Sequence, residues 1–160
     1  MAEVVLREAG PADCDRIAGW IRELAAHEGR PEAATVTGDD LRRWCFGVRR
    51  AAEAFVIESG GEDAGYAIVC TTYATFQGKP TLYLEDLFID PAMRSRGLGA
   101  QVMAHLARMA IERECCALDW SAVEGNDGAI AFYRRLGARD VHGICKFRLD
   151  GEALRAISDR

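Results

Sequence analysis

The chain has 160 residues, of which 49% are hydrophobic and 28% charged, and a net charge of −5. These values are typical of one soluble domain with a sizeable core, and the negative charge offers no basic surface for nucleic acid. No run of roughly 18 apolar residues predicts a membrane span. The charged N-terminus and six cysteines without a CxxC pair lead us to expect a cytoplasmic protein with free thiols and no metal site.

The first half of the chain alternates strands with short helices. A strand at residues 4–7 leads into a helix at Pro11, because proline suits the first helical position and apolar residues then recur at helical spacing. A shorter helix begins at Thr37, whose side chain suits an N-cap. Strands at 54–57 and 66–73 flank a Gly-Gly turn and predict a β-hairpin.

The second half begins with a long strand at residues 81–89. The elements predicted after it are, in order, a helix after Gly97, a strand at 117–123, a helix from Asn126 to Gly137, a strand at 144–149 and a helical turn at 152–157. There is no internal repeat or linker. We therefore expect one domain, residues 1–160, of the α/β class, with a mixed sheet and helices on both faces.

The strand at 81–89 changes phase at its acidic pair, Glu85 and Asp86. The leucines before the pair and the apolar residues after it alternate out of phase by one position. One extra residue near the pair would restore the phase, which is what a β-bulge does. A central strand buried on both faces would give the same pattern, because Tyr83 and Phe88 are apolar too. The sequence leaves both interpretations open.

A glycine- and arginine-rich segment, residues 94–100, joins this strand to the next helix. Glycine lets the main chain approach a ligand closely, and the free N–H groups of a helix start favour an anion. Arginine could add contacts to a phosphate. Val102 stands where a dinucleotide fingerprint needs glycine, and no Walker triplet occurs. The alternative is a plain strand-to-helix turn with solvated arginines.

The motif R-x-x-G-x-G at 94–99 resembles the coenzyme A pyrophosphate loop of the GNAT superfamily of N-acetyltransferases. The strand at 83–89, and Asn126 followed by 132–138, resemble the diamine (spermidine/spermine) N-acetyltransferase branch in order and spacing. The segments at 7–14 and 23–28 are similar to that branch as well. The resemblance implies acetyl transfer from acetyl-CoA to a primary amine by direct attack, in a homodimer, without a metal.

The resemblance also implies roles for individual residues. Glu85 matches the residue that deprotonates the amine, and Tyr133 matches the general acid that protonates the departing thiolate. A structural acid and a packed core residue are the respective alternatives. The N–H of Phe88 or a neighbour would polarise the acetyl carbonyl. The positions matched to the cofactor are Leu87, Phe88, Ile89, Arg94, Ser95, Arg96, Gly97, Leu98, Gly99, Ala100, Asn126 and Arg135. Those matched to the substrate are Glu28, Phe76, Glu85 and Asp86.

The substrate pattern departs from that of the polyamine enzymes. Ala74 stands where they carry an acid, Phe76 where they carry tryptophan, and residues 142–144 lack another acid and tryptophan. Fewer contacts to a distant amine indicate a shorter substrate, such as a diamine, a lysine-like side chain or a thialysine-like amino acid. Acetylation of a peptide or protein amine, and a non-catalytic acyl-CoA-binding module, stay open.

Overall fold

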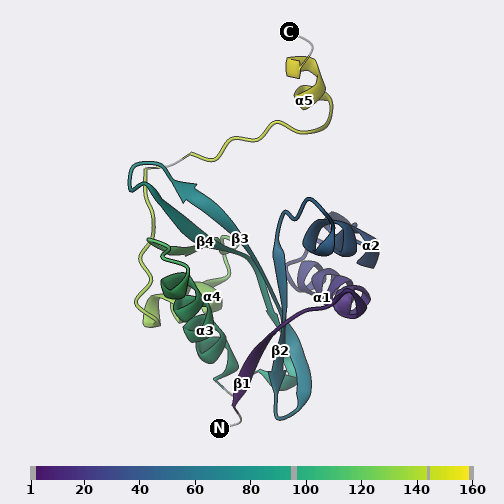
Figure 1. Ribbon diagram of the computed structural model, residues 1–160, viewed down its shortest axis with the longest axis vertical. Coiled ribbons are helices and arrows are strands. Elements are labelled where there is room, and N and C mark those ends of the chain that lie inside the picture. Colours follow the sequence, from purple (N-terminus) through teal and green to yellow (C-terminus); the bar gives the residue numbers. More distant parts are fainter. Residues whose placement is uncertain (1–2, 95–96, 144, 159–160) are drawn as a thin grey trace. The chain divides into compact units, whose positions relative to one another are not determined.

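The computed structural model describes residues 3–94, 97–143 and 145–158 (Figure 1). The chain divides into two compact units, Met1–Gly125 and Asn126–Arg160. The expectation that residues 1–160 form a single domain stays a prediction. Within the described residues, no helix has the length and apolar character needed to cross a bilayer.

The first unit is built on a five-stranded mixed sheet. Its strands, in spatial order, are β1 (Val4–Glu8), β2 (Glu53–Ser59), β3 (Glu62–Ala74), β4 (Lys79–Ile89) and β5 (Leu118–Trp120). Neighbours from β1 to β4 are antiparallel, whereas β5 runs parallel to β4. The predicted hairpin and the predicted mixed sheet are both confirmed.

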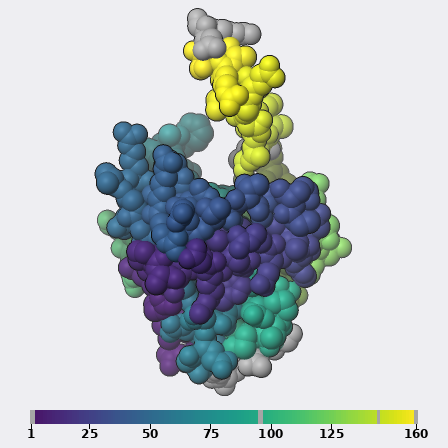
Figure 2. Space-filling view, turned by 90° about the vertical axis from the view of Figure 1, so that its right-hand side faces the viewer, coloured from purple at the N-terminus to yellow at the C-terminus, as the bar shows by residue number. Residues whose placement is uncertain are grey.

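Helices cover both faces of this sheet, as predicted (Figure 1). On one face lie α1 (Cys14–His27) and α2 (Gly38–Leu41), and on the other lies α3 (Leu98–Glu112). Figure 2 shows the first of these faces, where α1 and the segment after it form a purple-to-blue surface. Thr37 caps α2 as expected, because its hydroxyl accepts from the Asp40 N–H at 3.2 Å. A π-helical turn, Arg42–Phe46, prolongs α2.

Apolar side chains fill the space between each helix layer and the sheet. The core on the α1 side, called here the α1-side core, includes Ile17, Trp20, Val56, Tyr66, Ile68 and Phe88. Leu82, Leu84, Val102 and Leu106 are buried outside it, where β4 packs against α3. The two layers of core hold β4 in the middle of the unit, so its side chains serve both faces.

A β-bulge interrupts β4 at the acidic pair, which confirms the phase argument made from the sequence. Ile68 of β3 lies opposite Asp86, but the next residue, Val69, lies opposite Leu84. Glu85 is therefore the extra residue that has no counterpart on β3. The parallel ladder between β4 and β5 ends at Leu84, directly before the bulge.

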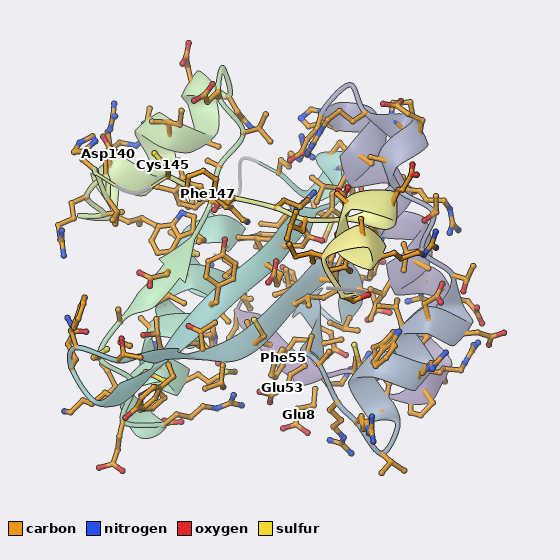
Figure 3. All side chains as sticks on the ribbon, turned by 90° about the horizontal axis from the view of Figure 1, so that it is seen from above. Glu8, Glu53, Phe55, Asp140, Cys145 and Phe147 are labelled. Carbon is orange, nitrogen blue, oxygen red and sulfur yellow. The ribbon has the colours of Figure 1, made fainter. Side chains whose placement is uncertain are left out.

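The second unit contains two helices, α4 (Asp127–Arg135) and α5 (Gly151–Ser158). The predicted cap of α4 is confirmed, because Asn126 Oδ1 accepts from the Ala129 N–H at 3.1 Å. The predicted strand at 144–149 is wrong for residues 145–149, which form no strand; Ile144 lies outside the described residues. An alternating pattern that includes Cys145 and Phe147 (Figure 3) is not enough to form a strand. A strand must also hydrogen-bond to a partner strand, and the described part of this unit contains no other strand.

The strand predicted at 117–123 is also shorter than expected, since β5 covers only Leu118–Trp120. Its partner strand, β4, bends at the bulge, and the hydrogen bonds between β4 and β5 end there. The same bulge thus explains the extra residue in β4 and the early end of β5.

Candidate active site

The bulge turns both acidic side chains of β4 to one face of the sheet. Side chains alternate along a strand, so Glu85 lies on the opposite face from Leu84, which is buried outside the α1-side core. Asp86 shares the face of Phe88, which belongs to that core. Glu85 and Asp86 are consecutive, yet both face the α1 side. Glu85 is exposed, whereas Asp86 is partly buried.

A third carboxylate joins them from the end of α1. Glu28 follows the last helical residue, and its Oε2 accepts from Arg30 Nη2 at 2.6 Å. Burial, the charge of Glu28 and the charge of Glu85 raise the pKa of Asp86 to about 6, while the nearby Tyr66 hydroxyl opposes that rise. The structure therefore brings together three predicted substrate residues, Glu28, Glu85 and Asp86, named here the acid cluster.

Two residues of β3 that the sequence analysis missed lie against this cluster. The Cys70 thiol donates to Glu85 Oε1 with an Sγ–Oε1 distance of 3.6 Å. Burial and the nearby Glu85 raise the pKa of Cys70, so the thiol keeps its proton. Tyr66 is fully buried below Asp86. A phenol and a thiol four positions apart in the apolar stretch 64–70 of this strand were the available signal.

Beyond the bulge, β4 has a strand on only one side. Its pairing with β5 covers Leu82, Tyr83 and Leu84 and goes no further. Among the described residues, the segment from Glu85 to Ile89 pairs with β3 alone. The outer edge of this segment can therefore offer main-chain groups to a ligand.

The ladder determines which main-chain groups face that open edge. The N–H of Asp90 donates to the Ala64 carbonyl at 2.9 Å. Because residues of an antiparallel strand point alternately toward and away from their partner, Phe88 also bonds to β3. The N–H groups of Leu87 and Ile89 point the other way. The resemblance led us to expect that the N–H of Phe88 or a neighbour polarises the acetyl carbonyl. Because the Phe88 N–H is bonded to β3, the N–H groups of Leu87 and Ile89 are the remaining candidates.

Arg94 folds back onto the end of β4. Its Nε donates to the Ile89 carbonyl at 2.9 Å, and its guanidinium lies 5.8 Å from the centre of the Phe88 ring. Its Nη1 lies 3.5 Å from Nε2 of His27. The contact with Ile89 agrees with the alternation, since that carbonyl also faces the open edge. This contact occupies the carbonyl of Ile89 and not its N–H. Of the two outward N–H groups, that of Leu87 follows the acid pair directly in the sequence.

The segment matched to the pyrophosphate ends in a helix start. Gly97 caps α3 with φ of 74°, a left-handed conformation that glycine adopts without a steric penalty. Leu98, Gly99 and Ala100 form the first turn, and the first intrahelical bond runs from the Gln101 N–H to the Gly97 carbonyl. First-turn N–H groups have no acceptor within their helix, which fits an anion. Ser95 and Arg96 lie outside the described residues.

The other predicted site residues lie elsewhere in the chain. Tyr133, Asn126 and Arg135 belong to the second unit, where burial raises the pKa of Tyr133 and keeps its hydroxyl protonated. Phe76 is fully exposed in the turn between β3 and β4. The strand from Lys79 to Glu85 spans about 20 Å, so the structure does not bring Phe76 to the acid cluster.

A cavity of about 290 Å³ opens on another part of the first unit, between β1, β2 and α3. Its walls include Leu6, Glu8, Phe55 and His105, and none of the predicted site residues lines it. Figure 3 shows Glu8 and Phe55 beside Glu53, whose carboxylate forms a two-pronged ion pair with Arg113. Glu53 and Arg113 are paired with each other and no predicted site residue lines the cavity, so the acid cluster stays the candidate site.

The comparisons with known proteins agree with this geometry. A model of the "Acetyltransferase (GNAT) family" matches residues 17–138. The chain belongs to this acetyltransferase family. It is therefore an N-acetyltransferase, and the family match includes residues of both units.

Among relatives of this GNAT protein, a thialysine N-epsilon-acetyltransferase of Sus scrofa is 31% identical over a 171-residue alignment that covers 100% of both chains. A spermidine/spermine N(1)-acetyltransferase-like protein 1 of Homo sapiens is 33% identical over 159 residues, covering 93% of this chain and 23% of that one. An integron cassette protein from the mobile metagenome of V. cholerae shares the fold, with a TM-score of 0.81, 24% identity and coverage of 100% and 99%.

Proposed function

We propose that this enzyme transfers the acetyl group of acetyl-CoA to a primary amine of a small molecule. The β-bulge is the observation that carries the proposal, because it points Glu85 and Asp86 to one face beside an unpaired strand edge. A site for amine acetylation needs a group that accepts a proton and a donor that polarises a carbonyl. The two needs are met within three consecutive residues, 85–87.

The acid cluster supplies the amine side of the reaction. A primary amine with a pKa near 10.4 arrives as an ammonium ion and must lose a proton before it can attack. Glu28 and Asp86 attract the cation, and Glu85, which is exposed, accepts the proton through water. The thiol of Cys70 keeps the Glu85 carboxylate in place.

The open edge of β4 and the start of α3 supply the acetyl-donor side. Bound acetyl-CoA would provide the activated acetyl thioester. The Leu87 N–H would stabilise the negative charge that develops on the carbonyl oxygen, and the first-turn N–H groups of Leu98, Gly99 and Ala100 would hold the pyrophosphate. Tyr133, whose raised pKa keeps it protonated, would give a proton to the departing sulfur.

The distribution of acids favours a short amine. The acid cluster lies just past the middle of β4, and the hairpin turn about 20 Å away presents Phe76 without an acid at Ala74. The names of the relatives give substrates of different length: thialysine, spermidine or spermine, and L-ornithine. The L-ornithine N5-acetyltransferase is a protein of Arabidopsis thaliana that is 31% identical over 94 residues. We infer that a thialysine-like or ornithine-like side chain is preferred to a full polyamine.

The test measures acetyl-CoA consumption with thialysine, L-ornithine, L-lysine, spermidine and an N-terminal peptide amine. We expect turnover with the amino acids, less with spermidine and none with the peptide. The Tyr133→Phe variant should lose kcat by about 10²-fold or more, and the Tyr73→Phe variant, which loses an exposed hydroxyl, should keep it. Binding of coenzyme A without acetylation of any amine in the panel would contradict the proposal.

A further inference from the structure

Tyr66 of β3 has no part in the proposed chemistry, and its environment is unusual. The residue is completely buried in the α1-side core. Its ring lies between two others, with centroid distances of 6.3 Å to Trp20 and 6.1 Å to Phe88. Among the described residues, its hydroxyl finds no hydrogen-bond partner of standard geometry.

The hydroxyl faces the acid cluster. Tyr66 pairs with Phe88 across the ladder, and Asp86 pairs with Ile68, two residues further along β3 on the same face. Such diagonal neighbours are within reach of a long aromatic side chain. Asp86 and Glu28 are the charged groups nearest to the phenol, and with burial they raise the pKa of Tyr66.

A buried phenol needs an explanation in this position. Phenylalanine would make the same ring contacts with Trp20 and Phe88. It would also avoid the cost of burying a hydroxyl away from water. Trp20 and Phe88 clamp the ring, so the hydroxyl has a fixed direction. Asp86, the diagonal neighbour of Tyr66 on the same face of the sheet, is the carboxylate that this hydroxyl can reach.

We propose that Tyr66 is a positioning residue, whose buried hydroxyl donates a hydrogen bond to Asp86 and holds that carboxylate, ionised, toward the substrate ammonium. The inference rests on the proposed function, because it assigns Asp86 to the amine. It gives the two neighbouring acids different roles. Asp86, held by the buried Tyr66 hydroxyl, binds the cation, and the exposed Glu85 accepts the proton.

The groups that face Asp86 come from three elements. Glu28, paired with Arg30, faces it from the end of α1, and Glu85, held by Cys70, faces it from β4. Burial and these two carboxylates raise the pKa of Asp86, and the Tyr66 hydroxyl, on β3, lowers it because a hydrogen bond favours the ionised form. Removing the hydroxyl should therefore raise the pKa of Asp86 further.

The experiment compares wild type with Tyr66→Phe, and with Tyr73→Phe as a control that removes an exposed hydroxyl from the same strand. Carboxyl-carbon NMR follows the titration of Asp86 in the protein alone, with Asp86→Asn identifying the signal. We expect a midpoint near pH 6 in wild type and in the control, and a midpoint about one pH unit higher in Tyr66→Phe.

Kinetics with thialysine provide a second readout. At pH 6.5, Tyr66→Phe should raise KM about five-fold with kcat within two-fold of wild type, and the difference in KM should close by pH 9, where Asp86 is ionised in both proteins. An unchanged Asp86 midpoint in Tyr66→Phe overturns the inference, whatever the activity. A loss of kcat that is equal at every pH also overturns it, because that is the effect of disturbed packing.

The two proposals fail in different ways. If the Asp86 midpoint moves as expected but wild type acetylates no amine, the proposed function is wrong and the hydrogen bond from Tyr66 stands. If wild type acetylates thialysine but the midpoint does not move, Asp86 is held by another group and the role of Tyr66 is wrong.

Discussion

The two halves of β4 differ in a way that separates folding from function. From Leu82 to Leu84 the strand has neighbours on both sides and buries Leu82 completely. From Glu85 to Ile89 it has one neighbour among the described residues, presents two carboxylates on one face, and turns the Leu87 N–H to an open edge. A single inserted residue marks the boundary.

The difference shows how one strand can hold a core and a reactive site together. The first half gains stability from apolar burial and a complete ladder. Among the described residues, the second half has no strand on its outer edge, which costs stability but leaves main-chain groups available to substrate. We therefore expect substitutions before Glu85 to lower mainly stability, and substitutions from Glu85 onward to lower mainly activity.

The largest expected effect is the loss of the proposed base. Glu85→Gln keeps the size of the side chain and removes its capacity to accept a proton, so kcat should fall by about 10²- to 10⁴-fold. Because Glu85 is exposed, the midpoint of urea unfolding should stay within error of wild type. Glu62→Gln, which neutralises an exposed acid at the start of β3, should change neither quantity.

The second effect is on stability in the first half of the strand. Leu82→Ala should lower the free energy of unfolding by about 2–5 kcal/mol, because it opens a cavity at a fully buried site. The activity per folded molecule should change little. Leu87→Ala, at a partly buried site in the second half, should cost less stability. An equal or larger cost for Leu87→Ala, measured by urea unfolding, would contradict the division.

Sequence reasoning could predict this division because the pattern of leucines breaks at the acidic pair. A period-two pattern with one phase error is consistent with a bulge or with a strand buried on both faces, and the register decides for a bulge at Glu85. Capping chemistry likewise predicted the helices that begin after Thr37 and Asn126, because a side-chain acceptor and its N–H donor lie within three residues of each other.

The sequence could not predict features that depend on partner backbone. The alternating segment at 145–149 reads as a strand, but pairing is decided by residues far away in the chain. For the same reason, the ladder was needed to show where β5 ends and to propose Leu87, not Phe88, as the carbonyl donor. Tyr66 and Cys70 lie in an apolar stretch of β3, and only the register shows which of its residues face the acids.

A smaller effect concerns the stability cost of Asp86. Its pKa is raised from 3.8 to about 6 in the folded protein. Between these values the folded protein binds a proton that the unfolded chain releases, so the free energy of unfolding falls as the pH rises from about 4 to 6. The ionised group then destabilises the protein at every higher pH.

Asp86→Asn should remove this penalty while it impairs amine binding. At pH 8 the variant should gain about 1–3 kcal/mol in its free energy of unfolding over wild type, relative to the difference between the two at pH 3. Urea unfolding at both pH values measures the gain. If the free energy of unfolding differs between Asp86→Asn and wild type by the same amount at both pH values, ionised Asp86 does not destabilise the protein. The second half of β4 would then give up no stability for its site.

The smallest expected effect is that of Cys70, which touches the site from the neighbouring strand. Its thiol donates to Glu85 at 3.6 Å and remains protonated because its pKa is raised. A thiol is a weak donor, so Cys70→Ala should lower kcat only about two- to five-fold. Cys70→Ser, which restores a hydroxyl donor, should recover most of the loss, and Cys145→Ala, at an exposed cysteine, should have no effect. Equal losses in the Ala and Ser variants would mean that Cys70 acts by packing, and that the carboxylate of Glu85 is oriented by the bulge alone.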